Sequence, residues 1–225
     1  MDEASIIWLS MKVAFTASLV GLPIAIGLAV LLARVNFFGK TFVSAVLHLP
    51  VLLPPVVTGF ALLIAFGRKG FIGATLYNLT GFTFAFHWWG AALAAGIMSL
   101  PIVVQPMRVA FENIDSEIDE AALTLGASRW QKFWLITLPM AMPGVMAGVV
   151  LGFVKALGEF GATITFVSNI PGETQTLSLA IYSLLQSPNG DAAALRLVWI
   201  SVALSFAAVF ASDFFARRFR HNKLS

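Results

Sequence analysis

Cysteine is absent from this 225-residue chain, and charged side chains make up only 11% of it. Without cysteine the chain can form neither a disulfide framework nor a thiolate metal site. Its three histidines, at positions 48, 87 and 221, are scattered and lack the spacing of metal ligands. Soluble domains carry about 25% charged residues, whereas 59% of this chain is hydrophobic. The composition therefore indicates a membrane protein.

Motifs for hydrolytic chemistry are missing as well. The sequence has no HExxH zinc motif and no serine nucleophile motif. Gly39-Lys40-Thr41 is not a phosphate-binding loop, because Arg34 stands where that motif requires its first glycine. Glu159 is the one acid that could titrate in an intramembrane cavity, so proton coupling has little support. We expect no enzymatic activity, no bound metal and no nucleic-acid partner.

Long apolar runs are what the sequence has instead. At about 1.5 Å per residue, each is long enough to cross a hydrocarbon core of about 30 Å. The runs lie at about 10–33, 42–66, 86–109, 134–157 and 192–215. Asp2 and Glu3 replace the basic start of a signal peptide, so we expect the first run to remain as a span. The prediction is an all-α membrane protein, one domain over 1–225 with five transmembrane helices.

Prolines interrupt the second run and point to a path across the membrane. They remove backbone donors and break the helix, and broken backbone at membrane depth survives only beside protein or water. A simple kink is the equally weighted alternative. A small and polar segment after the fourth run adds further candidates, and in it Glu159 should pair with Lys155 or face water. The candidate path residues are Pro50, Pro54, Pro55, Thr58, Glu159 and Thr163.

Glycines recur every four residues in the fourth run, at Gly144, Gly148 and Gly152. This spacing lets two membrane helices approach closely. The contact could be with another helix of the same chain or with a second copy in a dimer, and both alternatives stay open.

The longest polar segment, at 112–135, separates the third and fourth runs. It holds five of the chain's 11 carboxylates, namely Glu112, Asp115, Glu117, Asp119 and Glu120. A membrane protein that places its most charged segment between two spans displays that segment to water, and a docking surface for another protein is one reason to do so.

The local pattern of this segment predicts helix, turn, helix. Ser116 and Asp119 have capping-box spacing, so a helix should begin near Ser116. Gly126 stands where a C-terminal cap is expected, and Ser128 with Gln131 forms a second capping box. Four residues form a narrow apolar stripe on the first helix, opposite Glu120: Ile118, Ala121, Ala122 and Leu125.

Basic residues predict the orientation. With five spans, the loop at 34–40, the polar segment and the C-terminal tail share one side and hold nine of the 14 lysines and arginines. The positive-inside rule places that side in the cytoplasm and the N-terminus outside.

The same polar segment resembles the EAA loop of ABC importer permeases. The positions that match are Glu120, Ala121, Ala122, Gly126, Ile136, Leu138 and Pro139. In that family the loop is a coupling helix that fits a groove on a cytoplasmic ATPase subunit. The resemblance implies the type I ABC importer permease fold and ATPase coupling through these residues. A solvated connector in a secondary transporter or channel, or a membrane scaffold, are the alternatives.

Longer stretches sharpen the resemblance. HLPVLLPPVVTG, GRKGFIG and GEFGATITFVSNIPGET are similar to molybdate permeases of the ABC importer class, and sulfate and tungstate permeases share the architecture. The likeness implies a homodimer in a bacterial or archaeal cytoplasmic membrane. It further implies two ATPase subunits, which would bind ATP and magnesium, and an external protein that delivers the oxyanion. Which oxyanion is carried stays open among molybdate, tungstate and sulfate.

Overall fold

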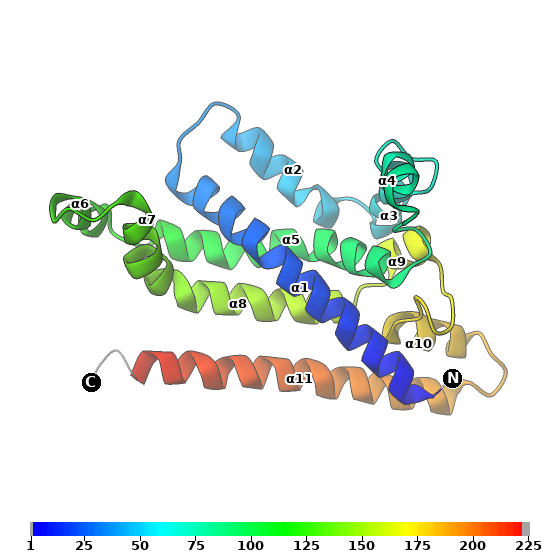
Figure 1. Ribbon diagram of the computed structural model, residues 1–225. Helices are drawn as coiled ribbons and strands as arrows, with labels where there is room; N and C mark the ends of the chain where they lie inside the picture. Colours follow the sequence, from blue (N-terminus) through cyan, green and yellow to red (C-terminus); the bar gives the residue numbers. More distant parts are fainter. Residues whose placement is uncertain (1, 222–225) are drawn as a thin grey trace.

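A computed structural model describes residues 2–221, with side chains as far as residue 211, and within that range the regular structure is helical (Figure 1). The helices are α1 (Glu3–Arg34), α2 (Lys40–Leu52), α3 (Pro55–Phe66), α4 (Gly73–Thr80), α5 (Trp88–Glu112), α6 (Ser116–Thr124), α7 (Arg129–Lys132), the π-helix η1 (Phe133–Thr137), α8 (Leu138–Leu157), α9 (Gly161–Val167), α10 (Leu177–Leu185) and α11 (Asp191–His221).

Four helices in the described chain are long and apolar enough to cross a membrane. They are α1, α5, the continuous stretch Arg129–Leu157 and the first 21 residues of α11. Four of the ranges predicted as spans fall largely on them. The bent pair α2 and α3 gives a fifth crossing if the two count as one span. An all-helical membrane fold is therefore confirmed.

The second predicted span is broken rather than continuous. Its two halves, α2 and α3, meet at an angle of 111°. At about 1.5 Å per residue, 13 and 12 residues reach only about 20 and 18 Å, so neither half crosses a core of about 30 Å alone. Pro54 and Pro55 have no N–H, so the helical hydrogen bonds end here. We call residues 50–57 the elbow.

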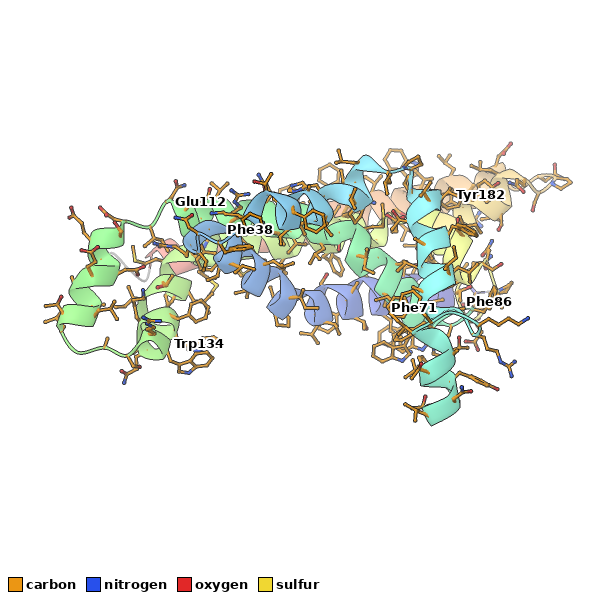
Figure 2. The ribbon with its side chains drawn as sticks, turned by 90° about the horizontal axis from the view of Figure 1, so that it is seen from above. Phe38, Phe71, Phe86, Glu112, Trp134 and Tyr182 are labelled. Carbon is orange, nitrogen blue, oxygen red and sulfur yellow. The ribbon has the colours of Figure 1, made fainter. Side chains whose placement is uncertain are left out.

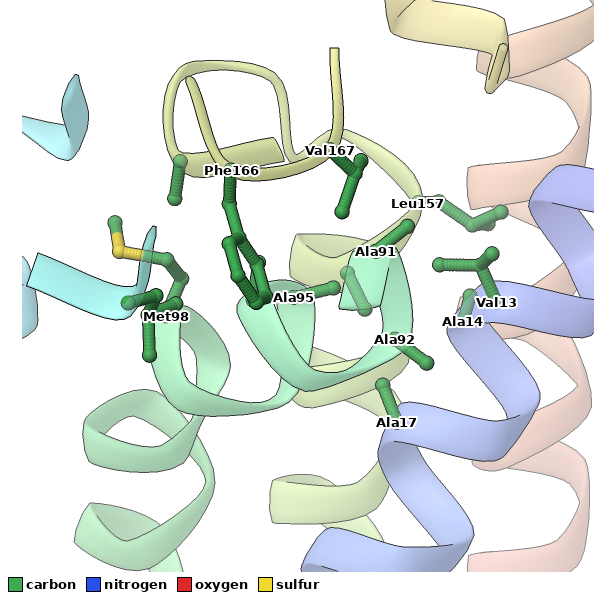
Figure 3. Packing of buried hydrophobic residues seen from close by; sticks show 14 of the residues in the cluster. Val13, Ala14, Ala17, Ala91, Ala92, Ala95, Met98, Leu157, Phe166 and Val167 are labelled. Carbon is green, nitrogen blue, oxygen red and sulfur yellow. The ribbon is translucent and has the colours of Figure 1, made fainter. Parts of the chain in front are cut away.

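Small side chains bring the central helices together. Alanines of α5 are fully or almost fully buried against α1 and α9, including Ala91 and Ala95. Phe166 and Val167 of α9 reach onto this face of α5, where the small side chains of Ala91 and Ala95 leave room for them (Figure 3). In a membrane this close packing, rather than transfer out of water, is what holds helices together.

The glycine stripe of α8 packs against α5 of the same chain. A Cβ at Gly144 would lie 2.3 Å from the Cβ of Ala110, and one at Gly148 would lie 2.6 Å from the carbonyl oxygen of Val103. A Cβ at Gly152 would meet Val103 Cγ2 at 2.3 Å. Of the two alternatives left open by the sequence, the intrachain contact is the one that the structure contains.

The two ends of the bundle differ. α6, α7 and the carboxyl end of α11 lie at one end, and the start of α1 lies at the other with α3, α4, α9 and α10 (Figure 1). Figure 2 shows the same separation, with Glu112 and Trp134 near the first end and Phe71, Phe86 and Tyr182 at the second.

Candidate functional site

Helices α6 and α7 form a hairpin that projects beyond the bundle (Figure 1). We call residues 115–132 the coupling hairpin, after the role that the EAA-loop resemblance implies for them. The Asp115 side chain accepts a hydrogen bond from the Glu117 N–H at 3.0 Å and so caps α6. The predicted helix start near Ser116 is confirmed, but Ser116 is not the cap. Asp115 takes that role because its extended backbone places the carboxylate over the free N–H groups.

The turn and the second helix follow the prediction. Gly126 has φ +88°, a left-handed conformation that glycine adopts without the steric cost that other residues meet. In the capping box, Gln131 N–H donates to Ser128 Oγ at 3.2 Å, and Ser128 N–H donates to Gln131 Oε1 at 2.9 Å. Reciprocal bonds of this kind fix where α7 begins.

The apolar stripe of α6 is mostly turned to solvent. Ala122 is buried against its own chain, whereas Ile118 and Ala121 are exposed and Leu125 is 88% exposed. Glu120 is exposed on the same helix. An apolar surface on a projecting tip is the usual property of a protein-binding site. Three of the four EAA-loop positions at this tip, Glu120, Ala121 and Gly126, are thus accessible to a partner.

The remaining EAA-loop positions lie at the root of the hairpin. Leu138 is buried, and Ile136 and Pro139 are half-buried. The Leu138 N–H donates to the Phe133 carbonyl five residues earlier, which defines the π turn of η1. Single π turns occur frequently at functional sites. These residues therefore join the hairpin to α8.

Asp119 holds the hairpin to the bundle, a role that the sequence analysis missed. Its Oδ2 lies 3.3 Å from Arg34 Nη1 and 3.2 Å from Lys132 Nζ. Thr137 Oγ1 lies 3.4 Å from both Asp119 Oδ1 and the Lys132 carbonyl oxygen, and its hydroxyl can donate to either. The sequence does contain a signal for the inward position of Asp119. Asp119 precedes Ala122 by three residues, so the two lie on the same face of α6, and Ala122 is buried. Nothing in the sequence identified Arg34, 85 residues away, as its partner.

The path candidates divide into two groups at the other end of the bundle. Pro54 and Pro55 are exposed at the elbow, with Pro50 half-buried beside them. Thr58 and Thr163 are buried, 8% and 1% exposed, where α3 packs on α9. Close approach is possible because a Cβ at Gly59 would lie 2.5 Å from the Ala162 carbonyl oxygen.

Glu159 is buried at the junction of α8 and α9. Its carboxylate pairs with Lys155, as the four-residue spacing predicted, and accepts a hydrogen bond from the Ala162 N–H at 3.1 Å. Both contacts hold α9 at its position behind the elbow. Across residues 2–211, no three His, Asp or Glu side chains are grouped so that they could hold a metal ion.

Known structures place this fold in a class. The chain superposes with a TM-score of 0.76 on a chain of a bacterial alginate ABC transporter, solved in complex with an alginate pentasaccharide-bound periplasmic protein. The match covers 97% of this chain and 80% of that chain, at 20% sequence identity. The architecture is that of type I ABC importer permeases, as the EAA-loop resemblance implied.

Comparison with related sequences identifies the family within this class. The chain is 51% identical to the Haemophilus influenzae molybdenum transport system permease protein ModB, over 96% of this chain and 94% of that protein. It is 52% identical to the Escherichia coli K12 protein of the same name, over the same shares of the two chains. Residues 21–221 match the binding-protein-dependent transport system inner membrane component family, and the chain belongs to this family.

Proposed function

We propose that this chain is the permease of an ATP-driven molybdate importer. Two copies would form the translocation path, and two cytoplasmic ATPase subunits would dock on the two coupling hairpins. ATP would bind these subunits rather than this chain. An external binding protein would deliver the oxyanion. The observation that carries the proposal is the coupling hairpin, an EAA loop whose apolar tip projects from the bundle.

The exposed tip supports docking of a partner. Leaving apolar surface in water costs about 25 cal/mol per Å², so Leu125 and Ile118 favour a covering protein. The distribution of charge on the polar segment also supports docking of a partner. Glu112 pairs with Arg108, Asp115 accepts a hydrogen bond from the Glu117 N–H, and Asp119 pairs with Arg34, so all three bind groups of their own chain. Glu117 and Glu120 remain exposed beside the apolar residues, where a basic rim of the partner could contact them.

The elbow supports a path at the interface of two copies. The carbonyl groups of Pro50 and Val51 cannot receive the usual helical hydrogen bond, because the residues four positions later are Pro54 and Pro55. The elbow side chains are nevertheless exposed in the single chain. Backbone polar groups are not left open to lipid. A second copy and a water-filled path would cover them, with α9 as the support behind α3.

Alternating access follows from these two ends. Closure of the ATPase subunits would draw the paired hairpins together, and the bundles would open the path at the elbow to the outside. The hairpin and the carboxyl end of α11 would then lie in the cytoplasm, and the start of α1 outside. A conduit with no arginine in mid-span suits rapid release of a dianion, because tight binding would slow conduction.

Docking is tested by Leu125→Asp. Loss of a buried leucine contact is worth about 1.5–3 kcal/mol, so affinity for the ATPase should fall about tenfold or more. The measurement is copurification of the ATPase from membranes, together with ATP-dependent molybdate uptake in proteoliposomes. Leu79→Asp is the matched control, since Leu79 is 80% exposed on α4 at the opposite end. Unchanged copurification with Leu125→Asp would contradict docking at the hairpin.

The substrate is tested on the cognate binding protein. We expect it to bind molybdate, and sulfate only far more weakly. Preference for sulfate would assign this permease to a sulfate importer. Uptake that needs an ion gradient but neither the ATPase nor ATP would replace the proposal with a secondary transporter.

A further inference from the structure

We propose that Asp119 is the positioning residue through which movement of the coupling hairpin reaches α1 and α8. The inference rests on the proposed docking of the hairpin on an ATPase. Three residues surround Asp119, and with it they form what we call the Asp119 hub: Arg34, Lys132 and Thr137.

The hub connects separate elements. Arg34 is the last residue of α1, Lys132 the last of α7 and Thr137 the last of η1. Asp119 belongs to α6, the helix that carries the exposed tip. One carboxylate therefore links the docking helix to the first span and to the root of the fourth. Displacement of α6 must either move these ends or break the contacts.

Partial burial strengthens the ion pairs of the Asp119 hub. The side chains of Asp119, Arg34 and Lys132 are 17%, 21% and 21% exposed, and Thr137 is 4% exposed. Partly buried ion pairs are screened by salt far less than surface pairs. Loss of one partner also leaves the others poorly solvated and unpaired.

Other carboxylates of the same segment do not make such a link in the described chain. Glu112 pairs with Arg108 one turn away in the same helix. Asp115 bonds the N–H of Glu117 within α6, and Glu117 is exposed. Asp119 thus differs from its neighbours in joining the hairpin to distant parts of the fold.

The Arg34 guanidinium group does not use all of its N–H donors within the described chain. Its Nε and Nη2 atoms are buried without a hydrogen-bond partner among the described residues, and its one contact to Asp119 is long at 3.3 Å. Guanidinium and carboxylate groups prefer a two-bond fork. A shift of α6 toward the end of α1 would turn the shared contact into that fork and release Lys132. That shift would give the hub a second arrangement, and an element with two arrangements is what transmission between sites requires.

The test uses the reconstituted complex of permease, ATPase and binding protein. For Asp119→Asn we expect the ATPase to copurify and ATP hydrolysis to continue. Molybdate uptake per ATP hydrolysed should fall about fivefold or more, as expected for losing charge-assisted hydrogen bonds. Asp119→Glu, which keeps the charge, should recover much of this ratio. Glu112→Gln, in the same polar segment, is the control and should leave the ratio within about twofold, because its surface pair with Arg108 contributes little.

A second variant covers the possibility that Asp119→Asn does not insert. Arg34→Lys keeps the charge but removes the fork, so the ratio should again fall while copurification persists. A normal uptake-to-hydrolysis ratio in the variant that inserts would overturn the inference. Failure of the wild-type permease to copurify with the ATPase would instead overturn the docking proposal, so the two failures are distinct.

Discussion

Glycine serves two unrelated purposes in this chain, and each is visible at single residues. Gly126 adopts φ +88° with open space around it, so its role is conformational. Gly148 is helical, and its role is to leave room, since a Cβ there would meet the Val103 carbonyl oxygen at 2.6 Å. The spacing pattern alone could not separate an intrachain from an intermolecular contact, because it records only that some helix comes close.

Gly126→Pro should abolish transport while the permease still inserts. Proline fixes φ near −65°, which is incompatible with the turn between α6 and α7, so the hairpin cannot present its tip. Gly126→Asn is the control, because asparagine tolerates the left-handed conformation better than most residues. Molybdate uptake and the amount of protein in membranes are the measurements. Normal uptake with proline would show that the turn has no part in coupling.

Gly148→Ala should destabilise the bundle by about 1–3 kcal/mol, the usual cost of overpacking. Its methyl group would press on Val103 and on Met107 Cε, which lies 2.9 Å from the added Cβ position. Gly27→Ala in α1 is the control, because nothing lies within 4 Å of its Cβ position and alanine favours helix. Thermal unfolding in detergent should separate the two variants, and equal midpoints would contradict this packing.

At the scale of elements, the elbow shows which features of the second span the local sequence predicts and which it does not. The prolines predicted that the second span breaks, and it does. They could not predict the 111° bend. That angle depends on α3 lying against α9, where a Cβ at Gly161 would meet Pro55 Cβ at 2.6 Å. The contact joins residues about one hundred positions apart, so no local pattern encodes it.

Exposure at the elbow should be detectable by cysteine labelling, and the absence of native cysteine gives a clean background. Leu53→Cys should react with an aqueous thiol reagent, because thiolates form only where water reaches them. Thr58→Cys should react more slowly, since Thr58 is 8% exposed beneath the elbow. Leu19→Cys, on the outer face of α1, is the expected unreactive control. No labelling at Leu53→Cys in the assembled complex would argue against a watery elbow.

At the scale of the whole molecule, the hydrophobic runs were enough to predict an all-helical membrane protein, and the EAA spacing was enough to predict the family. The side-chain contacts between distant segments could not be predicted from the sequence. Arg34 and Asp119 belong to a span end and a polar helix 85 residues apart. Only the packing of α1 and α8 along α5 brings the two together, so the hub follows from the tertiary fold.

The arrangement of the ends predicts an asymmetric labelling pattern in intact cells. Ser5→Cys, at the exposed start of α1, should react with a membrane-impermeant thiol reagent. Ala127→Cys, in the turn of the coupling hairpin, should react only after the cells are opened. The opposite pattern would place the hairpin outside, where no ATPase could reach it.

The π turn of η1 makes chain length critical at one point. An α-helix advances about 100° and 1.5 Å per residue. Deleting one residue between Phe133 and Thr137 would therefore leave a regular helix but rotate everything before it by just over a quarter of a revolution. Insertions and deletions that a loop would absorb are therefore excluded here. Homologous sequences should therefore keep the residue count of this turn fixed.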